Sequence, residues 1–286
     1  MTSLHESFRG AAGNRLAADV FGNAGRPVLL LHGGGQTRHA WRRTAIEIAR
    51  AGMIAYAVDQ RGHGDSEWVA DGAYAFDDFA TDVAAVAVTL EQRHGAAPVV
   101  IGASLGGISA LLAAGQASKP IFAALVLVDI TPRVDLGGVA KVQGFMRTHA
   151  RDGFATVEEA ADAVAAYLPH RPRPRSHEGL KKNLRLHPDG RWRWHWDPRF
   201  LDGRRSVNGD RSVLVDKLLA AARGLTIPAM LVRGGSSELV HEEHAKEFLT
   251  LVPHARYADV SGARHMVAGD RNDQFSAAIL EFLNGL

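Results

Sequence analysis

The sequence has no cysteine among its 286 residues, which excludes disulfide bridges and any catalysis that uses a thiolate. It has no apolar run as long as the roughly 18 residues that a membrane-spanning helix needs. Residues 1–26 also lack the apolar stretch of a secretory signal, because polar and charged side chains recur throughout them. These absences predict a cytoplasmic protein that does not bind a membrane.

An excess of charge of one sign is missing as well, since the formal net charge is only +2 at pH 7. Such a balance does not favour a nucleic-acid partner, so we expect a small-molecule substrate and a monomer or homodimer. One basic run, HRPRPR at residues 170–175, could bind an anionic surface. Its alternating prolines favour an extended, solvated loop instead.

Short apolar runs separated by amphipathic segments predict an α/β protein. From the second run onward they are nearly continuous in valine, isoleucine and leucine, as in parallel strands covered on both faces. The predicted strands are residues 15–21, 27–31, 53–58, 98–101, 124–128, 229–232 and 255–260, and the predicted helices are 38–50, 77–94, 105–116, 242–251 and 270–283. The alternation indicates a mostly parallel central sheet with helices on both faces, which binds ligands at the carboxyl ends of its strands.

This alternation stops after Asp129 and resumes at Ile227. Between them, helical patterns cover residues 134–151, 157–167, 176–186 and 210–223, whereas residues 191–196 alternate with period two. We expect residues 1–130 and 226–286 to form the core domain. Residues 131–225 are predicted to form an inserted, mainly helical cap over the crevice.

Residues 102–107 read GASLGG directly after a predicted strand. A serine between small residues, where a strand passes into a helix, is placed to act as a nucleophile. The flanking glycines allow a turn too tight for larger side chains, so that Ser104 projects from the end of the strand.

The segment after the strand at residues 27–31 reads HGGGQ. Its glycines allow backbone N–H groups to approach a ligand, and with the N–H of Leu105 they could stabilise an oxyanion by about 3 kcal/mol per donor. A phosphate cradle is the first alternative, but the Lys-Ser/Thr ending of a P-loop is missing. A plain structural turn is the second alternative.

A serine nucleophile needs a base and a carboxylate to orient that base. Among the 14 histidines, His265 is placed best, because it follows the last predicted strand. Glu238 follows the strand at residues 229–232 in RGGSSE and gives the order serine, acid, histidine. Asp129, which ends the strand at residues 124–128, is the alternative acid, and we favour Glu238. The charged turn DQRGHGDS at residues 59–66 is predicted to support the site structurally rather than to catalyse.

Taken together, HGGGQ, DQRGHGDS, GASLGG, RGGSSE and HMVAGDRND resemble the α/β-hydrolase fold family, in its capped esterase and lipase-like branch. The resemblance covers the whole chain except the cap. It implies Ser104 as nucleophile, His265 as general base, Glu238 as triad acid, and Gly34 with Leu105 as oxyanion-hole donors; Gly35 remains an alternative to Gly34. The chain departs from many relatives in having Glu238 rather than aspartate and Arg264 rather than glycine before the histidine.

This resemblance implies a capped serine hydrolase that cleaves carboxylic esters or lactones through an acyl-enzyme, with no metal or organic cofactor. Epoxide hydrolases and dehalogenases of this fold use an aspartate nucleophile, so Ser104 argues against both. Three alternatives stay open: a carbon–carbon bond hydrolase of vinylogous diketones, a cofactor-free perhydrolase or haloperoxidase-like enzyme, and a non-catalytic ligand-binding relative.

The aromatic residues of the predicted cap bear on the substrate. Strand alternation places Trp192, Trp194 and Trp196 on one face, where they would form an apolar wall for a substrate. The alternative, which we favour, is that these tryptophans pack a hairpin against the cap helices. With Phe145 and Met146, they indicate a small to medium-sized apolar substrate.

Overall fold

A computed structural model describes residues 1–171 and 176–286, and its centre is an eight-stranded sheet with the order β1-β2-β4-β3-β5-β6-β9-β10. The strands are β1 (Leu4–Arg9), β2 (Arg15–Phe21), β3 (Pro27–Leu31), β4 (Ile54–Val58), β5 (Val99–Ala103), β6 (Ala124–Val128), β9 (Ala229–Gly234) and β10 (Arg256–Val260). The pairs that involve β1 or β2 are antiparallel, and all other pairs in this sheet are parallel. The predicted mostly parallel sheet is therefore confirmed.

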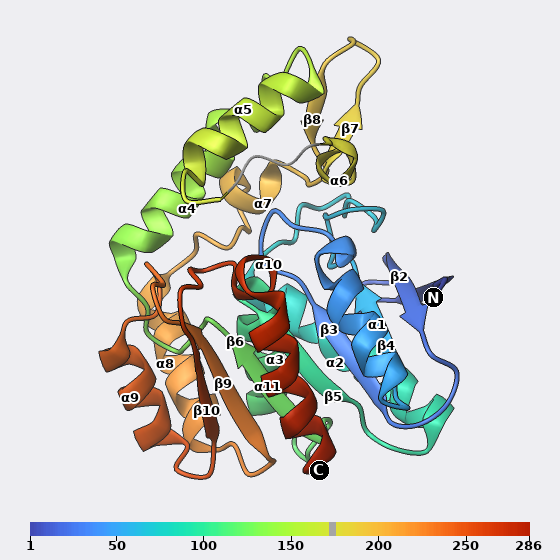
Figure 1. Cartoon of the computed structure of the whole chain (residues 1–286), viewed down its shortest axis with the longest axis vertical. Helices are drawn as coiled ribbons and strands as arrows, with labels where there is room; N and C mark the ends of the chain where they lie inside the picture. The colour runs from blue at the N-terminus through green and yellow to red at the C-terminus, as the bar shows by residue number, and fades with distance from the viewer. Residues whose placement is uncertain (172–175) are drawn as a thin grey trace.

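Two helical layers cover this sheet, which explains why its central strands β3, β4, β5 and β6 carry no charged side chain. In β3, Leu29 and Leu31 join one hydrophobic cluster, while Val28 and Leu30 join the other, because successive side chains point to opposite faces. The first cluster includes side chains of α2 (Phe76–His94), α3 (Leu105–Gln116), α8 (Arg211–Arg223) and α9 (Glu242–Leu251). The second includes side chains of η1 (Arg38–Trp41), α1 (Arg42–Arg50), α10 (Val267–Asp270) and α11 (Asn272–Asn284). Figure 1 shows α1 and α11 on the viewer's side of the sheet.

Residues 131–171 and 176–210, here called the insertion, come between β6 and β9 in the chain and lie beyond one end of the sheet (Figure 1). They form α4 (Leu136–Thr148), α5 (Val157–Tyr167), α6 (Glu178–Lys181), β7 (Leu184–Leu186), β8 (Trp192–Trp194) and α7 (Arg199–Asp202). Apolar side chains of the insertion share a third cluster with Tyr74, Phe79 and Leu105 of the core. The helix α8, which the predicted cap range 131–225 includes, packs instead on α3 through Leu218 and Ala222.

The structure corrects one other predicted element and adds a strand that was not predicted. Residues 176–186 are not one helix, because α6 ends at Lys181 and Leu184–Leu186 pairs with β8 in an antiparallel hairpin. The last predicted helix, residues 270–283, corresponds to α11, and the short helix α10 precedes it and is separated from it at Arg271. Strand β1 was not predicted, because it has no apolar alternation and Phe8 is its only buried residue.

The prediction of an extended loop at residues 170–175 falls mostly on residues 172–175, which lie outside the described residues. Of the two described residues, Arg171 donates from Nε to Oδ1 of Asp270 at 2.6 Å. Across residues 1–171 and 176–286, no helix has the length and apolar character to cross a bilayer.

Candidate active site

Ser104 occupies the turn between β5 and α3 with a φ of 46°, a conformation that non-glycine residues rarely adopt. The turn is tight on both sides. A Cβ atom added to Gly102 would lie 2.5 Å from the carbonyl carbon of Gly106, and one added to Gly106 would lie 2.4 Å from the backbone oxygen of Leu31. The tight turn predicted from GASLGG is therefore confirmed.

His265 follows β10 and contacts a carboxylate at the end of β6. Its Nδ1 lies 2.8 Å from Oδ2 of Asp129, whose side chain is completely buried. Asp129 also accepts the backbone N–H of Gly234 at 2.8 Å and the hydroxyl of Ser237 at 2.5 Å. Three donors thus fix this carboxylate beneath the imidazole.

The prediction that Glu238 pairs with His265 is wrong, because Asp129 occupies that position. Asp129 directly follows β6, which lies between β5 and β9, so its short side chain reaches the imidazole from the middle of the sheet. Glu238 instead has a buried Oε2 that finds no hydrogen-bond partner among residues 1–171 and 176–286. Burial, together with the charge of Glu238, raises the pKa of Tyr167 to about 12. Chain order, the signal used to choose Glu238, is satisfied equally by Asp129.

Ser104 lies beside the strand that carries this carboxylate, because its N–H donates to the carbonyl of Val128 at 3.2 Å. Within the described part of the chain, no hydrogen bond joins Ser104 to His265. Their pairing as nucleophile and base stays a prediction.

The loop at residues 33–36, here called the oxyanion loop after its predicted role, lies next to Ser104. A Cβ atom added to Gly33 would lie 3.6 Å from Cβ of Ser104. The N–H of Gly33 donates to Oε1 of Gln36 at 3.2 Å, and the N–H of Gly35 donates to Nε2 of His63 at 3.1 Å. Among the described residues the N–H groups of Gly34 and Leu105 have no acceptor, which favours Gly34 over Gly35 as a donor to a ligand.

The turn at residues 59–66 is hydrogen-bonded throughout, as predicted. Asp59 accepts the N–H of Asp65 at 2.9 Å and pairs with the guanidinium of Arg38. The hydroxyl of Ser66 donates to the backbone oxygen of Asp59 at 2.5 Å. A Cβ atom on Gly64 would overlap the Asp59 carboxylate, so the turn requires glycine there.

Two buried histidines join this turn to the oxyanion loop. His32 lies with Nδ1 2.8 Å from the backbone oxygen of Gly33, and its Nε2 accepts the N–H of Gln60 at 3.0 Å. Burial lowers the pKa of His32 to about 4 and that of His63 to about 3. Both rings are therefore neutral at physiological pH.

Residues 26–271 match the model of the α/β-hydrolase fold family. The chain belongs to this family. Esterase Rv0045c of Mycobacterium tuberculosis is 31% identical over 277 residues, which cover 95% of this hydrolase and 86% of that esterase. Non-heme chloroperoxidase CPO-A1 of Kitasatospora aureofaciens is 26% identical, with 91% and 93% of the two chains covered.

Solved structures agree with this membership. That of E-2-(acetamidomethylene)succinate hydrolase has a TM-score of 0.83 at 22% identity, covers 99% of both chains, and shows the fold alone. The structure of the M. tuberculosis esterase has a TM-score of 0.74 at 28% identity and covers 100% of this hydrolase and 92% of that chain. The comparisons support a hydrolase.

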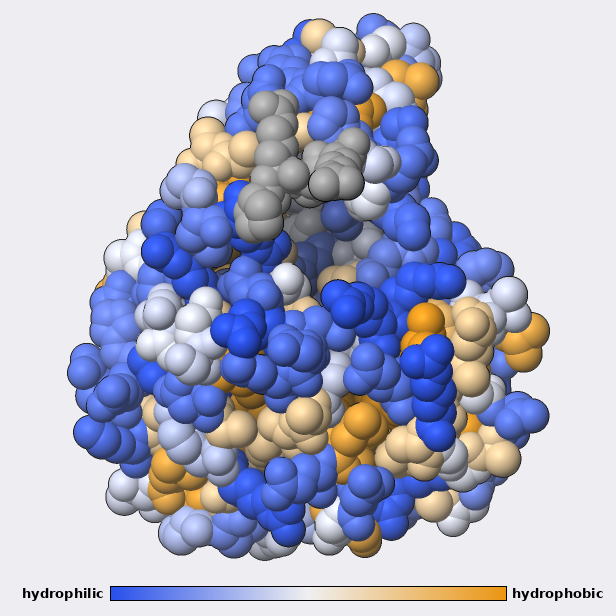
Figure 2. All heavy atoms as spheres, in the orientation of Figure 1, coloured by the Kyte–Doolittle hydropathy of each residue, from blue (hydrophilic) through white to orange (hydrophobic). Residues whose placement is uncertain are grey.

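Aromatic and sulfur-containing side chains of the insertion lie over the oxyanion loop of this hydrolase. A Cβ atom added to Gly35 would lie 2.9 Å from Cε of Met146 and 3.7 Å from Nε1 of Trp196. One added to Gly34 would lie 3.2 Å from the ring of Phe200. Figure 2 shows a hollow between the insertion and the core. Phe200 was not predicted, because no periodic pattern surrounds it.

The other predicted substrate-binding residues pack within the insertion. Trp194 lies 5.2 Å from Phe154 and 5.9 Å from Phe145, measured between ring centroids. Phe145 stacks on Tyr167 at 4.2 Å, and Trp192 is half-buried against the same cluster. Trp194 and Phe145 therefore have the packing role given above as the alternative, whereas Trp196 and Met146 lie at the oxyanion loop.

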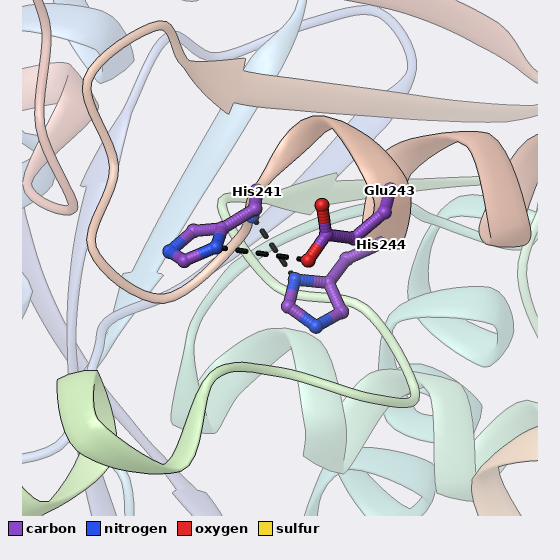
Figure 3. A group of neighbouring side chains, drawn as sticks. All are labelled: His241, Glu243 and His244. Atoms are coloured by element: carbon purple, nitrogen blue, oxygen red, sulfur yellow. Dashed lines mark hydrogen bonds and ion pairs between the residues drawn. The ribbon is translucent and has the colours of Figure 1, made fainter.

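His241, Glu243 and His244 come nearest to a set of metal ligands within the described residues (Figure 3). The Nδ1 of His244 accepts the N–H of His241 at 3.0 Å, which caps the first turn of α9. A cation bound to His244 would compete with this cap, and the amino-terminal end of a helix repels positive charge. The arrangement therefore favours helix capping over metal binding.

Proposed function

We propose that this hydrolase cleaves carboxylic esters or lactones through an acyl-enzyme formed on Ser104. The observation that carries the proposal is the contact between His265 Nδ1 and Asp129 Oδ2 at 2.8 Å, one residue beyond the carbonyl that accepts the N–H of Ser104. An imidazole oriented by a buried carboxylate is the group that activates a serine hydroxyl. Strained serine turns of this kind present the hydroxyl above the sheet.

In the proposed reaction, Ser104 Oγ attacks the carbonyl carbon while His265 Nε2 takes the hydroxyl proton. Asp129 accepts a hydrogen bond from Nδ1 and stabilises the imidazolium that forms. The N–H groups of Gly34 and Leu105 donate to the oxyanion. The carbon–oxygen bond to the alcohol then breaks, and His265 returns the proton to the departing oxygen. Water, deprotonated by His265, attacks the acyl-enzyme and releases the acid with free Ser104.

The side chains that lie above the oxyanion loop favour a substrate with an apolar acyl or alcohol group. Met146, Trp196 and Phe200 all approach the glycines of the loop. Burial of apolar substrate surface against such side chains contributes about 25 cal/mol per Å². We therefore infer small to medium-sized apolar esters as the substrate class.

Similarity to the non-heme chloroperoxidase favours a second candidate activity, acyl transfer to hydrogen peroxide. It would use the same acyl-enzyme, with peroxide in place of water as the attacking group. Peracid formation from acetate and hydrogen peroxide measures it directly.

Ser104→Ala tests the proposed function, and Ser109→Ala, on the helix α3 that follows Ser104, is the matched control. The wild-type enzyme should release a burst of p-nitrophenol from p-nitrophenyl butyrate and react with a fluorophosphonate. Ser104→Ala should lose at least about a thousandfold in turnover and all labelling. Ser109, whose hydroxyl donates to the Leu105 carbonyl at 2.7 Å, should be dispensable for both. Undiminished turnover or labelling of Ser104→Ala would reject the acyl-enzyme.

A further inference from the structure

His63 is completely buried where three segments meet: the oxyanion loop, the turn at residues 59–66, and the part of the insertion around Trp196. Its Nε2 accepts the N–H of Gly35 at 3.1 Å, and its Nδ1 lies 3.0 Å from the backbone oxygen of Arg61. The ring of Phe200 packs edge-on against it at 4.8 Å.

The two hydrogen bonds of His63 define its tautomer. A carbonyl oxygen only accepts, so Nδ1 carries the proton; a backbone N–H only donates, so Nε2 carries none. The charged groups facing the ring are Asp59 and Asp197, with His32 alongside, and burial outweighs both carboxylates in lowering the pKa of His63 to about 3. The ring is thus a permanent hydrogen-bond acceptor for Gly35.

Two successive peptide groups of the oxyanion loop are fixed in this way. The Gly33 carbonyl accepts from Nδ1 of His32 at 2.8 Å and from the N–H of Gln36 at 3.1 Å. Because a trans peptide is planar, fixing that carbonyl directs the N–H of Gly34 to the opposite side. His63 fixes the next peptide, whose N–H belongs to Gly35.

The insertion packs against the turn at residues 59–66 that carries His63. The N–H of Asp197 donates to the Gly62 carbonyl at 2.8 Å, and the N–H of Gly64 donates to the His195 carbonyl at 2.7 Å. The ring of Phe200 contacts both His63 and the position above Gly34. These contacts thus hold the insertion against the turn that carries His63.

We propose that His63 is a positioning residue for the oxyanion hole: by accepting the N–H of Gly35 it leaves the N–H of Gly34 free and directed at the reacting carbonyl. The proposal rests on the proposed function, because it assigns the donor that the acyl-enzyme reaction requires. A fixed donor raises the rate because it needs no reorganisation when negative charge develops.

Two amide variants test the two ring nitrogens of His63 separately, because each variant places a polar atom near one of them. His63→Gln places an amide oxygen near the position of Nε2 and keeps an acceptor for Gly35. His63→Asn keeps a donor for the Arg61 carbonyl and loses that acceptor. His94→Gln, a surface histidine that pairs with Tyr56, is the control.

We expect His63→Asn to lower kcat at least about tenfold with KM changed less than about threefold, and to weaken binding of an alkyl trifluoromethyl ketone by the same factor as kcat. That inhibitor adds to the Ser104 hydroxyl and presents an oxyanion, so it reports the hole directly. His63→Gln and His94→Gln should retain kcat and inhibitor binding within about threefold. Equal losses in the Asn and Gln variants, or a loss confined to KM, would overturn the proposal.

A measurement on the wild-type protein keeps the test independent of variant folding. Nitrogen NMR of the labelled imidazoles should show His63 with an unprotonated Nε2 throughout the pH range of activity. A protonated Nε2, or titration near pH 6.5, would overturn the assignment. Absence of fluorophosphonate labelling of Ser104 would instead reject the proposed function while leaving the His63 tautomer measurable.

Discussion

Asp129→Asn tests which carboxylate orients His265. The carboxylate of Asp129 accepts from Gly234, Ser237 and His265, and all three partners donate. An amide has one acceptor oxygen and one nitrogen that only donates. If the oxygen retains the Gly234 N–H, the amide nitrogen faces Nδ1 of His265. The imidazole must then carry its proton on Nε2, where it cannot accept the proton of Ser104.

The expected size of this effect follows from the tautomer. A wrongly protonated catalytic histidine lowers kcat by about 10⁴, which is about 5.5 kcal/mol of activation free energy. The loss of hydrogen bonds to the buried carboxylate should lower the free energy of unfolding by about 1–3 kcal/mol. Because domains of this kind have roughly 5–15 kcal/mol of stability, Asp129→Asn should remain folded.

The assay compares kcat for p-nitrophenyl butyrate in Asp129→Asn and in Glu238→Gln, with urea unfolding of both. Glu238→Gln should retain kcat within about threefold, because no described hydrogen bond joins Glu238 to His265. A loss of more than about a hundredfold in Glu238→Gln, together with a nearly active Asp129→Asn, would refute the assignment of Asp129.

Two predictions concern stability. Gly106→Ala should lower the free energy of unfolding by about 2–4 kcal/mol, because its Cβ would lie 2.4 Å from the Leu31 backbone. Gly144→Ala on α4 is the control: its Cβ would meet nothing within 4 Å, so this variant should be neutral or stabilising. Equal urea midpoints for the two variants would contradict this prediction. In the unfolded chain, histidines bind protons below about pH 6.5, whereas His32 and His63 of the folded protein bind them only near pH 4 and pH 3. The contribution of these two neutral rings to the free energy of unfolding is therefore complete above about pH 6.5. As the pH drops from there towards the two folded pKa values, this contribution falls by about 1.4 kcal/mol per pH unit for each ring. Urea unfolding across that range should show a shallower decline in His63→Gln, and an unchanged slope would count against a neutral His63.

Most of the sheet could be predicted from the sequence because strands buried on both faces leave a continuous apolar run. Strands β2, β3 and β6 have the predicted bounds, and the other predicted strands differ by one or two residues at one or both ends. Strand β1 escaped prediction because it pairs only at the sheet edge and buries only Phe8. Strand β7 escaped because a three-residue strand has too few positions to show a period, and its partner β8 lies several residues further on.

The site was predictable where one segment determines its own geometry. Ser104 and its glycines form a local turn, so the sequence contains all that defines it. The identity of the carboxylate that contacts His265 depends instead on which loop lies next to this histidine in the folded protein. The order of residues along the chain permits both Asp129 and Glu238. The positive φ of Asp129, 49°, and the hydroxyl of Ser237 directed at its carboxylate are visible only in three dimensions.

The hydrogen bonds of the two carboxylates explain why only one of them suits the orientation of a base. A residue that orients a base must be immobile, because rotation of the imidazole would move Nε2 away from the nucleophile. Asp129 meets this requirement, because its carboxylate is completely buried and three donors hold it. Any rotation of the side chain would break at least one of these hydrogen bonds. Glu238 has a longer side chain, is partly exposed and keeps a buried oxygen that receives no hydrogen bond from the part of the chain that the structure describes, so no described donor fixes its direction. The extra methylene of glutamate therefore matters less than the absence of donors around it.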